Sequence, residues 1–276
     1  MAAEDGTYVT VTSVRRTAGI GSSEINNTDV GAIIDEVEPQ VERYYNTVFT
    51  PREIIETQDG NGTLRMFLRN NPVLAVRDLY VDGTQEDTAN LNVYKGSGKI
   101  ELGQDATTST FKSGSKKIVI KYVYGFLEDS SITTTTDAAS TAGTSVALSV
   151  ADESSFTVGN WVEITGMDGN PESAQISATD TGEITVDQLV YAHESGSVII
   201  ELQVSQNFTK LMNIFCSIAM VARIVGESYT DIVGYNLEEF RVQKGEPYTQ
   251  WRETALQLIK ERDMLMAKIK QRPVVV

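Results

Sequence analysis

The residues best suited to chemistry are few in this sequence and stand far apart. His193, in YAHESGS, is the single histidine, and Cys216 is the single cysteine. A catalytic histidine needs a nucleophile or a carboxylate held beside its ring, whereas the stretch around His193 is typical of a connection between strands. We therefore expect His193 to be an ordinary surface or turn residue. Cys216 lies on the apolar face of a helical pattern, where cysteine packs as a small hydrophobic side chain, and the usual ligands of a zinc site are missing.

Two glycine-containing stretches are similar to ligand-binding loops but lack essential positions. KGSGKI, at 95–100, has no leading glycine and carries Ile100 where a phosphate loop needs Ser or Thr to bind magnesium. DGNG, at 59–62, is followed by apolar residues where a calcium loop needs acidic ligands. We interpret both stretches as hairpin turns.

Four carboxylates cluster on one predicted helix: Asp35, Glu36, Glu38 and Glu42. Paired carboxylates can act as acid and base, but these occupy the face opposite the apolar stripe, which indicates a solvated surface. No catalytic, metal-binding or cofactor-binding set of residues emerges. The sequence predicts a structural or interaction protein, not an enzyme, with no cofactor.

The composition is that of a folded protein with an acidic surface. Of the 276 residues, 41% are hydrophobic and 22% are charged, which suffices for a sizeable core. The 38 acidic against 23 basic residues give a net charge of -15, which disfavours gripping nucleic acid or an anionic membrane. The same charge suits a channel through which DNA slides, and it is also typical of a high-salt host. The acidic start of the chain and its single cysteine predict a soluble protein made in the cytoplasm.

Helical periodicity marks the two ends of the chain. TVTSVRRTAGI predicts a helix with a Thr cap and a stop at Gly19, and residues 27–49 predict a longer helix capped by Asn27 or Thr28. Pro39 predicts a kink or a break in that helix. Residues 208–227 are apolar on most sides and predict a buried central helix, and residues 247–270 predict a last one.

Between these ends the period changes to two. Residues 52–69 predict a hairpin with its turn at 59–62, and further turns are expected at 82–83 and 96–98. Strands continue beyond a Thr-rich stretch up to residue 203. We therefore expect an α+β fold: a helical core with a small antiparallel sheet, formed by residues 1–125 and 204–276, that carries an inserted all-β domain, a small barrel or sandwich, at 126–203.

Several stretches together resemble one protein family. YVTVTSVRRTAGI followed by NNTDVGAIIDEVEPQVERYYNTVFTP, and then LRNNPVLAVRDLYVDG, VYKGSGKIEL and FKSGSKKIVIKYVYGF, resemble the head–tail adaptor (connector, or head-completion) proteins of tailed double-stranded-DNA viruses. The resemblance covers the two flanks of the predicted insertion, about 190 residues. Most members of that family lack an insertion at 126–203.

The resemblance implies a bacteriophage-type virion protein of the neck, between capsid and tail. Such a protein docks under the portal ring, forms a ring of twelve copies by contact with itself, and extends the DNA channel toward the tail or stopper protein. DNA passes through without sequence-specific binding, and no membrane is involved. The protein would be made in the host cytoplasm before assembly.

Two sets of residues follow as candidates for binding partners. Pro273, Val274, Val275 and Val276 are either a frayed tail or a short segment that pairs as a strand with the portal or a neighbouring subunit. The alternative function is a carbohydrate- or receptor-binding accessory protein that acts through the β insertion. Its ligand-facing aromatic residues would be Phe156, Trp161 and Tyr191, although Trp161 falls in an alternating strand where a core position is equally compatible.

Overall fold

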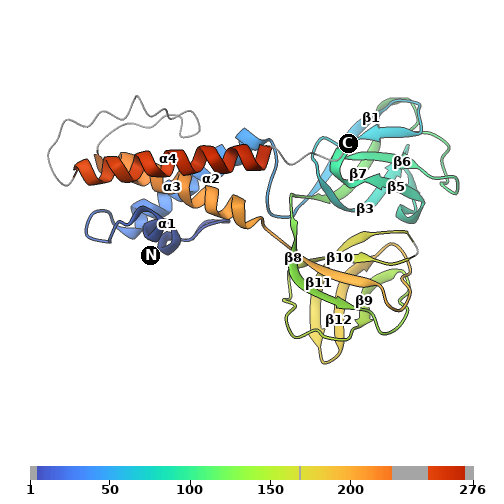
Figure 1. The fold of residues 1–276 in the computed structure, drawn as a ribbon. Helices are drawn as coiled ribbons and strands as arrows, with labels where there is room; N and C mark the ends of the chain where they lie inside the picture. The colour runs from blue at the N-terminus through green and yellow to red at the C-terminus, as the bar shows by residue number, and fades with distance from the viewer. Residues whose placement is uncertain (1–4, 168, 226–247, 271–276) are drawn as a thin grey trace. The chain divides into compact units, whose positions relative to one another are not determined.

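The computed structural model describes residues 5–167, 169–225 and 248–270 (Figure 1). The described residues divide into two compact units, one formed by residues 5–46 together with those described between 205 and 270, and the other by those described between 47 and 204. We call the first the helical unit and the second the β unit. Their described elements are helices in the first case and strands with two single-turn 3-10 helices in the second.

The helical unit begins with two capped helices. α1 (Val11–Ala18) starts at Thr10, whose side chain accepts the Ser13 N–H, and ends at Gly19, which adopts the left-handed conformation as predicted. α2 (Asn27–Tyr45) is capped by Asn26 and not by the predicted Asn27 or Thr28, since Asn26 Oδ1 accepts the Asp29 N–H at 2.8 Å. α2 continues through Pro39 without a break.

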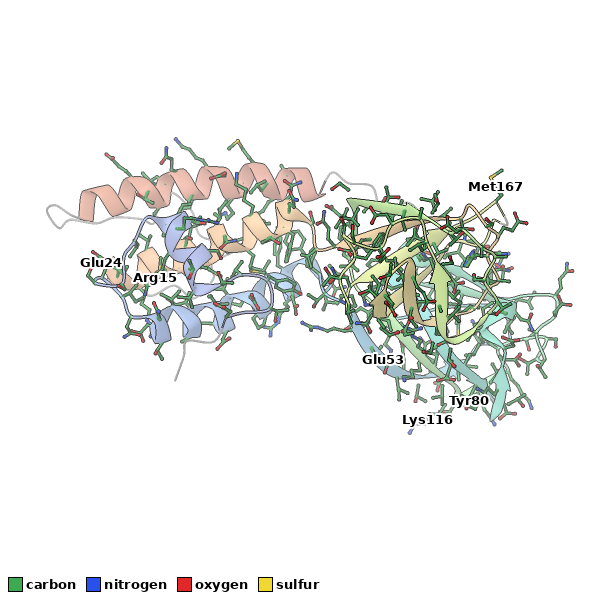
Figure 2. The ribbon with its side chains drawn as sticks, turned by 90° about the horizontal axis from the view of Figure 1, so that it is seen from below. Arg15, Glu24, Glu53, Tyr80, Lys116 and Met167 are labelled. Atoms are coloured by element: carbon green, nitrogen blue, oxygen red, sulfur yellow. The ribbon has the colours of Figure 1, made fainter. Side chains whose placement is uncertain are left out.

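The loop between α1 and α2 is held by Arg15. Its guanidinium donates to the carbonyls of Gly21 at 2.7 Å and Ile25 at 2.6 Å, and to Asn27 Oδ1 at 3.0 Å. Figure 2 labels Arg15 and Glu24, which lie at the end of the helical unit that carries this loop.

The central helix is α3 (Gln206–Val225), and the last described helix is α4 (Tyr248–Lys270). α3 contacts α1, α2 and α4, and it is buried along most of its length, which confirms the predicted central helix. Phe208 packs edge-on against Tyr8 at a centroid distance of 5.1 Å, and Ser217 Oγ donates to the Val14 carbonyl. Cys216 is fully buried in this core, also as predicted.

The β unit contains two lobes, each with its own hydrophobic core. The first lobe has a four-stranded antiparallel sheet of order β1-β7-β3-β4 and a three-stranded one of order β2-β6-β5. The 3-10 turns Thr88–Asn90 and Lys95–Ser97 flank β5. The strands are β1 (Arg52–Gly60), β2 (Arg65–Phe67), β3 (Val73–Val81), β4 (Thr84–Glu86), β5 (Leu91–Tyr94), β6 (Lys99–Leu102) and β7 (Gly114–Tyr124).

The second lobe is a six-stranded antiparallel sheet that closes on itself. Its order is β8-β13-β10-β11-β12-β9, and the two end strands meet where Thr136 bridges Val150 and the Asp137 N–H donates to the Ser149 carbonyl at 2.9 Å. Met167 lies at the β10–β11 turn and points into solvent (Figure 2). The strands are β8 (Glu128–Thr135), β9 (Gly143–Ser149), β10 (Trp161–Thr165), β11 (Glu172–Asp180), β12 (Glu183–Leu189) and β13 (Val198–Gln203).

The predicted fold class is wrong. In the described residues strand outweighs helix, 38% against 29%, and three antiparallel sheets of four, three and six strands replace the expected helical core with a small sheet. Strands of three or four residues, such as β2, β4 and β5, are too short to show a period-two pattern. The Thr-rich stretch, interpreted as a border of the insertion, supplies β8, because β-branched threonine fits a pleated strand well.

One predicted hairpin is also wrong, whereas two others are confirmed. β1 does not pair with β2: it pairs with β7, and β2 pairs with β6. The turns at 82–83 and 96–98 do join β3 to β4 and β5 to β6. The predicted domain boundary near residue 126 falls inside the β unit, between the cores of its two lobes.

Candidate functional site

A cleft of about 360 Å³ lies between the two lobes of the β unit. The first lobe contributes four consecutive residues of β3 together with β5, and the second contributes the approach to β11 and the end of β12. Its lining is part apolar and part polar: Leu74, Ala75, Val76, Arg77, Thr88, Leu91, Asn92, Val93, Tyr94, Lys95, Gly169, Asn170, Pro171, Glu172, Ser173, Gln188, Val190 and Tyr191. Its volume lies in the range of small-molecule and peptide pockets.

The walls of this cleft are tied together by Arg77. Its guanidinium forms an ion pair with Asp187 of β12 and donates to Gln188 Oε1 at 3.3 Å. It also lies over the Trp161 ring, 5.5 Å from the centroid. Arg77 is 11% exposed and Asp187 31%, so this pair is screened less than a surface ion pair.

A second tie involves Lys95, at the end of β5. Its ammonium forms an ion pair with Glu163 Oε2 at 2.8 Å and donates to Ser173 Oγ at 2.9 Å. Both cations of the cleft are therefore already neutralised by carboxylates of the second lobe. The cleft has no surplus positive charge with which to attract an anion.

Tyr191 completes the wall of the second lobe. Its hydroxyl donates to the Leu91 carbonyl at 3.2 Å, and burial, with the charges of Glu172 and Asp87, raises the pKa of its phenol. Glu172 accepts the backbone N–H groups of Val190 at 2.7 Å and Tyr191 at 3.0 Å, and its Oε1 lies 2.7 Å from His193 Nε2. These contacts fix the segment that carries Tyr191 against the start of β11.

The edge of β5 faces the cleft. Among the described strands, β5 is the end strand of its sheet and pairs with β6 alone. The Leu91 N–H donates to the Thr88 carbonyl, and its own carbonyl accepts the Tyr191 hydroxyl, so both groups point away from β6. Because backbone groups alternate along a strand, Val93 also directs its N–H and carbonyl away from β6. A strand edge is therefore available in the cleft.

The cleft continues into an acidic hollow. A second cavity of about 400 Å³ shares Arg77, Thr88 and Gln188 with the first and is lined further by Asp78, Gln85, Glu86 and Asp87. Glu86 is buried and accepts the N–H groups of Thr107 and Thr108. Within the described part of the chain, neither Asp78 nor Asp87 forms an ion pair, which leaves this hollow negative.

The three predicted aromatic residues occupy different environments. Phe156 is 7% exposed and belongs to the core of the second lobe. Trp161 is 5% exposed and packs with Leu74, Val123 and Leu202 between the lobes. Of these three residues, Tyr191 is the one that lines the cleft. The predicted docking segment Pro273, Val274, Val275 and Val276 lies outside the described residues.

Sequence reasoning missed two buried polar residues. His193, expected at the surface, is 2% exposed and is held by Glu172, 21 positions earlier in the sequence. Glu38, expected on a solvated face, is 7% exposed and accepts the backbone N–H groups of Thr7 and Tyr8, both at 2.8 Å. Neither partner could be found from local spacing, because each lies far from the residue in the chain.

Comparisons with known proteins do not assign this chain to a family. No model of a protein family matches it, and no curated protein matches it either. Within the described residues no group of three or more His, Cys, Asp or Glu side chains could hold a metal ion, and none of the described helices is long and apolar enough to cross a membrane.

Proposed function

We propose that this protein is a head–tail adaptor of a tailed double-stranded-DNA virus. It binds the portal ring, forms a ring of twelve copies and extends the DNA channel toward the tail or stopper protein. The observation that carries the proposal is the set of stretches within residues 8–126 that resemble that family, followed after residues 126–203 by the buried helix α3.

The composition of the helical unit supports this proposal. Its four described helices come from both ends of the chain, and the cap at Thr10, the stop at Gly19 and the buried central helix α3 belong to the stretches that carry or follow the resemblance. We propose that residues 1–125 and 204–276 form the adaptor body and that residues 126–203 are inserted into it.

The net charge supports a role around DNA. Twelve copies at -15 each carry a total of -180. A ring of such copies repels the phosphate backbone, and DNA that must pass through a channel benefits from weak adhesion to its wall. This function would need no sequence-specific contact.

Co-sedimentation with the portal protein of the same virus tests the proposal. We expect the chain to sediment with portal rings and native mass spectrometry to give twelve copies per ring. Image reconstruction of virion necks should then show density for the chain below the portal. Absence of the chain from purified virions, or no association with portal rings at low or physiological salt, would contradict the assignment.

The proposed insertion has its own test. In this variant a short Gly-Ser bridge replaces residues 126–203. The deletion removes Trp161 and Leu202 and so exposes apolar surface at Leu74 and Val123, which Leu74→Gln and Val123→Thr make polar. We expect this variant to unfold cooperatively and still bind portal rings. Loss of portal binding in a variant that stays folded would assign the docking role to residues 126–203 instead.

A further inference from the structure

We propose that the cleft of the β unit binds an extended peptide segment of a partner protein, which adds as a strand to the edge of β5 and directs a basic side chain toward Asp78 and Asp87. This inference does not depend on the adaptor assignment. It names a second binding activity, located on the β unit.

The first support is the backbone edge. Strand addition needs an unpaired edge with room beside it. Within the part of the chain that the structure describes, β5 meets both conditions, because it is an end strand that lines the cleft. The Leu91 carbonyl is occupied by Tyr191, so the N–H and carbonyl of Val93 are the main-chain groups that a peptide would meet first. Natural proteins cover or shorten such edges, since an open one invites pairing.

The second support is the side-chain lining beside that edge. Leu74, Val76 and Val190 supply apolar surface for the side chains of a peptide that alternate toward the protein. Arg77 and Lys95 are already paired with Asp187 and Glu163, so they offer no free charge to an acidic segment. The apolar part of the cleft therefore fits aliphatic residues rather than carboxylates.

The third support is charge. The acidic hollow continues from the apolar cleft through shared lining residues, and Asp78 and Asp87 form no ion pair within the described ranges. A Lys or Arg near the aliphatic residues of the peptide would gain a charged partner there. A saccharide fits less well, because the rings of Phe156 and Trp161 are buried in cores. Of the two tyrosines that line the cleft, Tyr94 has the Lys99 ammonium over its ring at 3.5 Å, and the Tyr191 hydroxyl is already bonded to the Leu91 carbonyl.

Fluorescence polarisation with synthetic peptides tests this inference on the full chain. The probe is fluorescein-labelled Val-Arg-Val-Thr-Val, and the comparison peptide has Glu in place of Arg. A third peptide carries an N-methyl group on its central Val, which removes a main-chain donor and keeps the side chains. We expect the arginine peptide to bind at least about tenfold more tightly than either comparison peptide, a difference of about 1.4 kcal/mol.

Two variants at one position separate backbone from side-chain recognition. Val93→Pro removes the edge N–H, which is not part of the β5–β6 ladder, so the fold should tolerate it. Val93→Ala keeps the N–H and shortens the side chain. We expect Val93→Pro to weaken binding at least about tenfold and Val93→Ala by no more than about threefold. Should Val93→Pro fail to fold, the N-methylated peptide gives the same answer on the unaltered protein.

The acidic hollow is tested by Asp78→Asn combined with Asp87→Asn, which keeps the cap that Asp87 provides to the 3-10 turn. We expect this variant to lose its preference for the arginine over the glutamate peptide. Equal binding of all three peptides, no binding at about 1 mM peptide, or saturable binding of a glycan in place of the peptides would overturn the inference. Portal co-sedimentation is read separately, so failure here leaves the adaptor proposal untouched.

Discussion

Glu38 Oε1, on α2, accepts the backbone N–H of Tyr8 at 2.8 Å, thirty positions earlier in the chain. The same carboxylate accepts the N–H groups of Thr7 at 2.8 Å and Val9 at 3.3 Å. A single side chain thus receives three consecutive main-chain donors and fixes the segment before α1 against α2.

Replacement of Glu38 by Gln should destabilise the protein. The amide keeps one acceptor oxygen but presents an NH₂ group to main-chain donors, so one or two charge-assisted hydrogen bonds are lost. We expect the free energy of unfolding to fall by about 2–3 kcal/mol in urea titrations. Glu36→Gln, an exposed position on the same helix, is the control and should change it by less than about 0.5 kcal/mol. Equal effects of the two variants would contradict the described contacts.

Gly6 directly precedes this segment, and the structure leaves no space for a side chain at its position. A Cβ at Gly6 would lie 2.3 Å from Ile34 Cγ2 and 2.4 Å from Glu38 Oε1. We expect Gly6→Ala to lower the free energy of unfolding by about 1–3 kcal/mol, as overpacking does elsewhere. Gly21→Ala is the matched control, because its Cβ would meet the end of the Glu24 side chain at 3.0 Å and Ser23 Oγ at an ordinary contact distance of 3.6 Å. A stabilising effect at Gly6 would show that the segment sits differently.

Tyr122 gives a prediction for alkaline pH. Its hydroxyl donates to Glu56 Oε2 at 2.6 Å, and burial, followed by this hydrogen bond, raises its pKa to about 12. The protonated phenol is favoured in the folded state, so its contribution to stability is complete below pH 10 and is lost between pH 10 and 12. We expect the free energy of unfolding to fall less steeply with pH in this window for Tyr122→Phe than for the unaltered protein. The two slopes should differ by up to about 1.4 kcal/mol per pH unit. Tyr45, with a pKa also raised to about 12 mainly by burial, adds a fall that persists in both proteins.

Arg77 and Asp187 should be energetically coupled. A double-mutant cycle with Arg77→Ala and Asp187→Ala, measured by urea unfolding, should give a coupling energy of about 1–3 kcal/mol. The pair Lys210 and Glu261, whose side chains are 58% and 38% exposed, provides the control, with a coupling of less than about 1 kcal/mol. Coupling no larger than that of the control pair would mean that Arg77 does not hold the two lobes together.

Cys216 should be unreactive in the folded protein. Burial, the first cause, and the nearby charge of Glu38 raise the pKa of its thiol well above the ordinary value. Because thiolate is the reactive form, we expect no modification by an aromatic disulfide reagent at pH 8 until urea unfolds the chain. The protein unfolded in urea is the positive control and should release one equivalent of the chromophore. Rapid modification of the native protein would contradict the packing of α3.

Local features of this fold could be predicted from the sequence, and pairings between distant residues could not. Thr10, Gly19 and the turn at 82–83 act through residues within a few positions, so their types reveal them. The pairing of β1 with β7 joins residues 54 to 72 positions apart, whereas β2 follows the turn at 59–62 directly and is the nearer candidate in the sequence. The hairpin prediction therefore chose the wrong partner.

The same distinction explains the candidate site. Tyr191 could be selected from the sequence as an aromatic residue in a β region, but the cleft beside it needs β3 and β5, about 100 positions away. No local pattern links Glu172 to His193, but the fold brings Glu172 Oε1 to within 2.7 Å of His193 Nε2. Buried carboxylates that accept main-chain N–H groups have no local sequence signature, which is why Glu38 was interpreted as a surface residue.

The closure between β8 and β9 has a consequence for crowding. Many copies held at high local concentration risk fusing through exposed strand edges, the first step of amyloid-like association. In the described residues the second lobe offers little such edge, because its terminal strands satisfy one another near Thr136 and Val150. Opening that seam would expose two further strand edges of the second lobe without unfolding its core.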